Sequence, residues 1–286
     1  MINQQQSAHG LFPWRDSRPP ASFDTKVDVV SVIMPTFNSE NSVERAIRSL
    51  VNQSYQNWEL LVCDDASTDN TLNIVRLHQA SDHRVRLLPS NINQGPGVAR
   101  NRGIAAATGR YIAFLDSDDE WVPHKLKRQI EVLNIHPRSP AICSAYHIVT
   151  TRPSQDCPLM VPPKRISYEM LRYHNFIGCL TVVYDTQRTN GKVLMPEIRQ
   201  RQDWGLWIRI AKTRGPFIGL QEPLGRLHRA NASMTSNKFR SAHYTTSMLR
   251  NELGMGPARA ILHTLIHNVI AAVRITRARR RGEKKR

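Results

Sequence analysis

The stretch VVSVIMPTFNSE at residues 29–40 decides the fold class. It opens with a short, β-branched, apolar run that ends at Pro35, which is the pattern of a strand buried on both faces. Strands of that kind belong to parallel sheets, because crossover helices cover both faces of such sheets. The first expectation is therefore a parallel α/β sheet whose first strand leads into a polar loop.

Strand-like and helix-like segments continue to alternate as far as residue 120. Helices are expected at 43–51, from about Asp69 and at 97–107, and strands at 58–63, 85–88 and 111–115. Four strands separated by helices predict a doubly wound, Rossmann-like, mostly parallel sheet flanked by helices, an arrangement that commonly binds nucleotides.

Beyond Asp119 the alternation becomes less regular. The expected elements are a helix at 124–134, a strand at 141–149, a Pro-rich connection at 153–163, a strand at 179–184, a helix carrying Trp204 and Trp207, and a strand at 217–220.

Length and composition fit one catalytic domain with a small appendage, since the chain has 286 residues and 40% hydrophobic content. Residues 1–26 are rich in Gln and Pro and lack the apolar region of a secretory signal, so a flexible leader is expected. The four cysteines are scattered without CxxC spacing. Neither a zinc site nor a disulfide framework is expected, and a reducing cytoplasm fits best.

Polar segments follow three of the four expected strands of the first half. They are PTFNSE at 35–40, DDASTDNT at 64–71 and DSDD at 116–119. Ligands of open α/β sheets bind outside the carboxyl ends of the strands, so these loops are expected to bring their carboxylates to one edge.

Asp116 and Asp118 present hard oxygen ligands at i and i+2, which suit a divalent cation that also keeps substrate phosphate in its shell. Such a cation would stabilise a departing nucleoside diphosphate. The Asp65 carboxylate is an acceptor for the imide N–H of uracil. The alternative for both acidic clusters is an ordinary turn in which an Asp caps the next helix.

Four motifs, SVIMPTFN, DDASTDNT, GPGVARNRGI and YIAFLDSDDEW, resemble in their order and spacing the signature of family 2 glycosyltransferases. The resemblance covers residues 29–235 and implies the GT-A fold and an inverting transfer from a nucleotide-sugar. Residues 27–120 would form the nucleotide-binding half and residues 121–235 the acceptor half.

The resemblance also implies roles for single residues. Pro35, Thr36 and Asn38 would line the nucleotide pocket, Asp65 would read the base, Arg100 would lie near base or diphosphate, Asp116 would contact ribose and metal, and Asp118 would bind the metal, Mn²⁺ or Mg²⁺. The alternatives are a strand-end turn for Thr36 and Asn38 and a solvated helix face for Arg100.

Inversion needs a base that takes the proton of the acceptor hydroxyl on the side opposite the leaving diphosphate. Asp203 is the candidate, because RQDWGLWIRIAK is similar to the family's Glu-Asp-Trp segment, with Gln202 in place of the Glu. The alternative is an Asp that only stabilises a helix N-terminus. Trp204 and Trp207 are candidates either for stacking on sugar or for the core.

His228 lies in GRLHRANASMTS, which resembles the family's flexible closing segment, and is a candidate metal ligand by that resemblance. The alternative is a solvated loop histidine. No Gln-x-x-Arg-Trp segment and no membrane channel follow, so transfer of a single sugar is expected instead of processive polymerisation.

Residues 236–286 are expected to form a helical, basic extension. Residues 256–286 hold nine Lys/Arg and one acid, so +8 of the formal net charge of +17 lies there. The apolar stripe at 261–275 and the basic end are typical of an amphipathic helix on an anionic membrane surface. A terminal helix packed on the core is the alternative. His263, His267, Asn268 and Arg274 interrupt the apolar run, so no membrane span is expected.

The expected function is therefore metal-dependent transfer of one sugar, with UDP-hexose as the default donor and GDP or dTDP donors left open. The expected acceptor is a saccharide or lipid-linked saccharide of surface polysaccharide synthesis, at the inner face of the cell membrane. A nucleic-acid-binding protein would explain the basic tail, but no matching motif accompanies it, so no nucleic acid partner is expected. A sugar nucleotidyltransferase would carry an early Gly-rich phosphate loop, which PTFNSENS is not.

Overall fold

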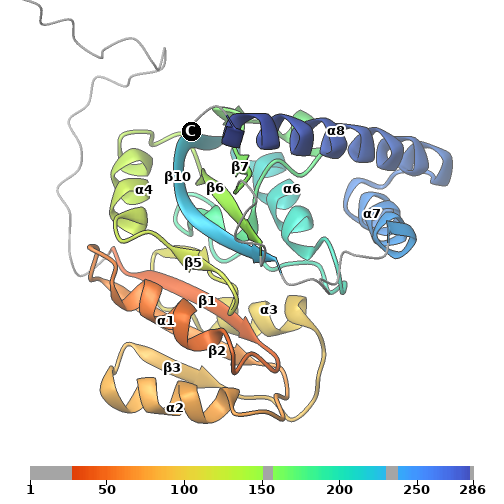
Figure 1. Ribbon diagram of the computed structural model, residues 1–286. Coiled ribbons are helices and arrows are strands. Elements are labelled where there is room, and N and C mark those ends of the chain that lie inside the picture. The colour runs from red at the N-terminus through yellow and green to blue at the C-terminus, as the bar shows by residue number, and fades with distance from the viewer. Residues whose placement is uncertain (1–27, 151–156, 230–237, 284–286) are drawn as a thin grey trace, which may run out of the picture.

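A computed structural model describes residues 28–150, 157–229 and 238–283, so the leader expected at 1–26 lies outside it. Within these residues the strands form one ten-stranded sheet (Figure 1). The strands are β1 (Val30–Thr36), β2 (Trp58–Asp64), β3 (Val85–Leu88), β4 (Tyr111–Phe114), β5 (Glu120–Trp121), β6 (Ala141–Thr150), β7 (Leu159–Met160), β8 (Arg165–Ile166), β9 (Val183–Asp185) and β10 (Phe217–Arg229).

The strand order is β3-β2-β1-β4-β9-β6-β10-β5, with β7 paired to β6 and β8 to β10. Strands β3, β2, β1 and β4 are parallel to one another, and β10 is parallel to β6. Strand β9 runs antiparallel to both of its neighbours, β4 and β6. The mostly parallel α/β sheet predicted from the sequence is confirmed.

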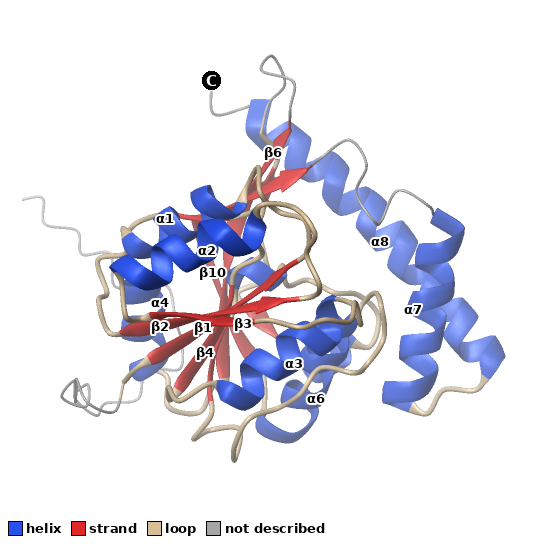
Figure 2. Cartoon of the chain, turned by 90° about the horizontal axis from the view of Figure 1, so that it is seen from below, coloured by secondary structure: helices blue, strands red, loops and turns tan. Residues whose placement is uncertain are grey.

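Helices cover both faces of the sheet (Figure 2), with α1 and α2 on one side and α3 and α6 on the other. The helices of the described residues are α1 (Val43–Val51), α2 (Thr71–Ser81), α3 (Pro96–Ala106), α4 (Lys125–Asn134), α5 (Tyr168–Leu171), α6 (Gln202–Arg214), α7 (Lys238–Leu253) and α8 (Pro257–Glu283). Alternate side chains of β1 enter different cores. Ile33 packs with the residues of α3 and α6, and Val32 and Met34 pack with those of α1 and α4.

Two of the expected elements differ in extent. The segment expected as a strand at 179–184 begins with a 3₁₀ turn at Cys179–Thr181, and only Val183–Asp185 pairs in the sheet. A continuous apolar run does not fix where a strand begins, and here the Thr181 hydroxyl donates to the Gly178 carbonyl and stabilises the turn. Strand β10 continues to Arg229, well past residue 220, because it pairs along β6.

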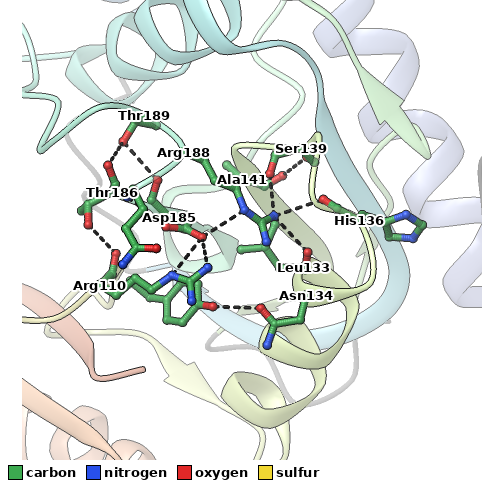
Figure 3. Close-up of polar contacts among 12 residues, drawn as sticks. Arg110, Leu133, Asn134, His136, Ser139, Ala141, Asp185, Thr186, Arg188 and Thr189 are labelled. Atoms are coloured by element: carbon green, nitrogen blue, oxygen red, sulfur yellow. Dashed lines mark hydrogen bonds and ion pairs between the residues drawn. The ribbon is translucent and has the colours of Figure 1, made fainter. Parts of the chain in front are cut away.

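A buried carboxylate joins the antiparallel strand β9 to the rest of the sheet (Figure 3). Asp185 is fully buried, and its Oδ2 accepts hydrogen bonds from Nε (3.1 Å) and Nη2 (2.7 Å) of Arg110. Arg188 Nε lies 3.0 Å from the same oxygen. The Arg188 guanidinium also donates to the carbonyls of Leu133, His136 and Ser139 at the end of α4. One acid thereby fastens β4, β9 and α4 together.

Replacing this acid is expected to destabilise the fold. Asp185→Asn removes the buried counter-charge of Arg188 and leaves Arg110 with Asp28 as its remaining ion-pair partner, so the free energy of unfolding should fall by about 3 kcal/mol in urea denaturation. Glu169→Gln removes an ion pair with Arg172 in which the Glu169 side chain is 66% exposed, and it should change stability by less than about 1 kcal/mol. Equal effects of the two substitutions would contradict the role assigned to Asp185.

Candidate active site

The three polar loops predicted from the sequence meet at one edge of the sheet. Strands β1, β2 and β4 are adjacent and parallel, so the loops that follow them leave from the same edge. Thr36 Oγ1 donates to Asp64 Oδ1 over 2.9 Å, and the Ser39 and Ser117 hydroxyl oxygens are 2.8 Å apart. Arg45 adds a 2.7 Å bond to the Asp118 carbonyl.

The residues expected to line the nucleotide pocket shape the loop after β1. Pro35 is buried in the strand, and Asn38 is exposed with a left-handed backbone, φ +48°. The Asn38 side-chain oxygen accepts the Thr68 N–H at 2.8 Å, and the Asn38 N–H donates to Ser67 Oγ at 2.9 Å. The loops after β1 and β2 therefore hold each other in place, and an Asn tolerates the required conformation.

Asp65 is buried, and both of its carboxylate oxygens accept backbone N–H groups. Gln94 donates to Oδ1 at 2.9 Å and Gly95 to Oδ2 at 2.7 Å. Asp65 thus fixes the loop that leads into α3. Each carboxylate oxygen can accept a further hydrogen bond. Contact between Asp65 and the nucleotide base stays a prediction.

A partly buried ion pair lies at the centre of the site. Arg100, on α3, donates from Nη2 to Asp116 Oδ1, while its Nε is buried without a hydrogen bond among the described residues. Burial by itself would lower the pKa of Arg100, but the negative charges of Asp116 and Asp203 raise it. The solvated helix face considered for Arg100 is wrong, because the residue is only 6% exposed.

Gly103 lets α3 pack close enough to the sheet to place Arg100 beside Asp116. A Cβ at Gly103 would lie 2.6 Å from both Ile33 Cγ2 and Cys63 Sγ, so only glycine lets the helix approach β1 and β2 this closely.

Further acids lie next to the ion pair. Loss of hydration and then the charge of Asp116 raise the pKa of Asp118 and, more strongly, that of Asp119. Asp119 Oδ1 accepts the His228 backbone N–H at 3.0 Å, and His228 Nε2 lies 3.5 Å from Glu120 Oε2. The structure therefore brings His228 to the DSDD loop, as the metal assignment requires. The helix-capping alternative for this loop is wrong, because α4 is capped at His124.

Asp203 is the second residue of α6, and it faces the same cluster of charges. Arg201 precedes the helix in a left-handed conformation, φ +68°, and Asn175 Nδ2 donates to Asp203 Oδ2 at 3.1 Å. Burial raises the pKa of Asp203, although the Trp204 N–H, Arg100 and Arg201 oppose the shift. A carboxylate with a raised pKa at this position is suited to accepting a proton.

Both tryptophans of α6 belong to the core, so the sugar-stacking alternative is wrong for each. Trp204 is fully buried and donates from Nε1 to the Leu171 carbonyl at 2.7 Å. Trp207 is also fully buried and packs edge-on against Phe114.

Sequence reasoning missed Asn175 and Asp119 as parts of the site. Asn175 lies in an irregular segment, and its amide is oriented because the Ile177 N–H donates to Asn175 Oδ1. No local pattern signals that role. Asp119 belongs to the DSDD motif, and its position after a buried strand indicates a place near the site.

The sequence profile described as "Glycosyl transferase family 2" matches residues 31–194. The chain is 36% identical over 213 residues to WfgD of Escherichia coli, named a UDP-Glc:alpha-D-GlcNAc-diphosphoundecaprenol beta-1,3-glucosyltransferase. That alignment covers 74% of this chain and 81% of WfgD.

Two solved structures share the fold. One is S. aureus TarS with UDP-GlcNAc, with a TM-score of 0.64 at 20% identity over 82% of this chain and 69% of TarS. The other is the mannosyltransferase PcManGT of Pyrobaculum calidifontis with GDP-Man and Mn²⁺, with a TM-score of 0.60 at 20% identity over 88% and 72%. Fold and sequence agree that the chain is a GT-A glycosyltransferase and belongs to glycosyltransferase family 2.

Proposed function

We propose that this enzyme transfers a single hexose from a UDP-sugar, with inversion, onto a lipid-linked saccharide in the synthesis of a bacterial surface polysaccharide. WfgD, its 36% identical relative, is named for a UDP-glucose donor and a diphosphoundecaprenol-linked acceptor. The observation that carries the proposal is the place of Arg100, whose guanidinium pairs with Asp116 and lies near enough to Asp203 for that carboxylate to raise the pKa of Arg100. The acid proposed for the donor and the acid proposed as the base therefore lie near the same guanidinium.

In this proposal the loops after β1 and β2 hold the nucleotide, with Pro35, Thr36 and Asn38 at the pocket and Asp65 toward the base. Arg100 supplies a fixed positive charge beside the donor diphosphate, where its buried Nε still lacks a hydrogen-bond acceptor within the described chain. Asp203 accepts the proton of the acceptor hydroxyl as that oxygen attacks the anomeric carbon, and Asn175 orients the carboxylate.

The acids at 116–119 fit a divalent cation that is shared with the substrate. Among the described residues, no three His, Cys, Asp or Glu side chains gather closely enough to hold a metal by themselves. Mg²⁺ and similar ions, however, usually bind one or two carboxylates together with substrate phosphates. Asp116 and Asp118 would supply these carboxylates, and His228 Nε2 is buried without a hydrogen bond among the described residues. A bound cation would neutralise charge on the leaving diphosphate.

Removal of divalent cations tests this assignment. Transfer from a UDP-sugar should fall by at least about 100-fold in EDTA and return with added Mn²⁺ or Mg²⁺, because several kcal/mol of leaving-group stabilisation are lost. Asp118→Asn should raise the Mn²⁺ concentration needed for half-maximal rate, whereas Asp82→Asn, at an ion pair outside the site, should not. Transfer that continues unchanged in EDTA would rule out the metal.

The base assignment makes a separate prediction. Asp203→Asn should lower kcat for transfer by about 100-fold or more while the Kd for UDP-sugar stays unchanged, because only proton transfer is removed. Since the base acts when deprotonated and its pKa is raised, the wild-type rate should fall on the acid side at a pH above the ordinary range of an Asp carboxyl. Retained turnover in Asp203→Asn would assign the base elsewhere.

We also propose that α8 rests on the inner face of the membrane. Three of its polar residues turn inward, since His263 and His267 are buried and Arg274 is half-buried. Its outward face carries a stripe of exposed apolar side chains: Ile261 53%, Leu262 56%, Leu265 58%, Val269 64% and Val273 44%. This reverses the usual amphipathic arrangement of a surface helix.

Helix α8 is also long enough to be compared with a membrane-spanning helix. Residues Pro257–Ala278 are long and apolar enough to cross a membrane by length and composition, although the polar interruptions had argued against a span. Two of those interruptions contact the folded domain, because His267 stacks on Trp204 with ring centroids 4.7 Å apart and His263 stacks on Tyr173 at 4.5 Å. An interfacial position leaves these contacts intact.

Vesicle co-sedimentation tests the membrane proposal. Leu262→Gln with Leu265→Gln should weaken binding to anionic phospholipid vesicles by more than about tenfold, since each buried Leu contributes about 1.5–3 kcal/mol. Leu77→Gln changes an equally apolar side chain on α2 that is 72% exposed, and it serves as the control. Equal binding of all three proteins would contradict the assignment of this face.

A further inference from the structure

A groove with a volume of about 320 Å³ lies where α8 crosses the chain around β7 (Figure 1). Its walls are mainly apolar, and two arginines of α8 reach into its lining. The residues that matter here are Met160, Val161, Pro162, Phe176, Arg274 and Arg277. None of them belongs to the donor side of the site.

Arg274 carries a charge that the protein does not neutralise. Its guanidinium donates to His174 Nε2 at 3.1 Å and to the carbonyls of Val161 at 3.2 Å, Asn175 at 3.4 Å and Phe176 at 3.5 Å, and it lies 5.1 Å above the Phe176 ring. Within the described residues, no carboxylate pairs with Arg274 or Arg277. Partial burial lowers the pKa of Arg274, which reflects the lack of a compensating anion.

The groove is connected to the base by two hydrogen bonds. The Asn175 carbonyl accepts from Arg274, and the Asn175 amide donates to Asp203 Oδ2 at 3.1 Å. Asn175 therefore links the arginine side of the groove to Asp203 by direct contacts. The exposed apolar face of α8 borders the same groove and continues away from it.

We propose that this groove binds the diphosphate and the first isoprene units of the lipid-linked acceptor, so that the acceptor sugar reaches Asp203. This inference rests on the proposed function. Arg274 and Arg277 pair with the diphosphate, Phe176, Met160 and Pro162 contact the proximal prenyl chain, and the remaining chain leaves along α8 into the membrane. Guanidinium groups are well matched to phosphate oxygens, and the apolar wall distinguishes a prenyl diphosphate from free diphosphate.

Arg277 gives the cleaner substitution, because it is exposed and, within the described chain, forms no hydrogen bond to the Asn175 segment, whereas Arg274 does. Arg277→Gln should raise KM for a polyprenyl-diphosphate-linked saccharide in detergent by about tenfold, the loss expected for a charge-assisted contact. The Kd for UDP-sugar and transfer to the same saccharide on a phosphate-free alkyl aglycone should not change. Arg259→Gln is the matched control, since Arg259 is exposed on the same helix about 27 Å from Arg277 by helical rise.

Calorimetric titration with farnesyl diphosphate in the absence of donor tests the groove independently of transfer. The wild-type protein should bind farnesyl diphosphate more tightly than inorganic diphosphate, and Arg277→Gln should weaken that binding by about tenfold. No binding, or equal affinity for the two ligands, would overturn the groove even if UDP-sugar transfer is established. Binding without any transfer activity would instead overturn the proposed function alone.

The transfer assay has a second decisive outcome. If Arg277→Gln reduces binding to anionic vesicles but leaves KM for the diphosphate-linked acceptor unchanged, the arginines contact bulk phospholipid and the acceptor site is refuted. An equal loss on the phosphate-free acceptor would also refute it, because the substitution would then act on the catalytic geometry.

Discussion

The ion pair between Arg100 and Asp116 is the contact on which the rest of the site depends. A guanidinium that is 6% exposed requires a counter-charge, and Asp116 supplies it from the end of β4. The position of Arg100 in turn depends on Gly103, which lets α3 approach β1, and on Asp65, which holds the loop before α3. The packing of α3 on the parallel sheet therefore also determines the electrostatics of the candidate site.

The first half of the fold was predictable from sequence because its information is local. Continuous apolar runs between polar loops gave β1, β2, β3 and β4 within one or two residues, and helical spacing gave α1 and α3. The convergence of the polar loops followed from the rule that parallel strands end at one edge. Thr36, Asp64 and Ser117 lie at that edge for the reason that the pattern implied.

The second half depends on contacts that no local pattern contains. The antiparallel pairing of β9 and the Asn175 contact with Asp203 join residues far apart in the chain. Helix α7 was not expected as a separate element. Helix α8 shows the same dependence on contacts between distant segments. Its sequence fits a core helix and a membrane helix equally, and only the packing of His267 and Arg274 decides which side faces the domain.

The way α8 is mounted has a mechanical consequence. His263, His267 and Arg274 hold α8 against the domain, so the helix keeps a fixed orientation relative to the sheet. Whatever plane its outer face adopts also fixes the tilt of the whole sheet and the direction in which the candidate site faces. Substrates confined to that plane would arrive by lateral diffusion in two dimensions, at a high effective concentration and already aligned.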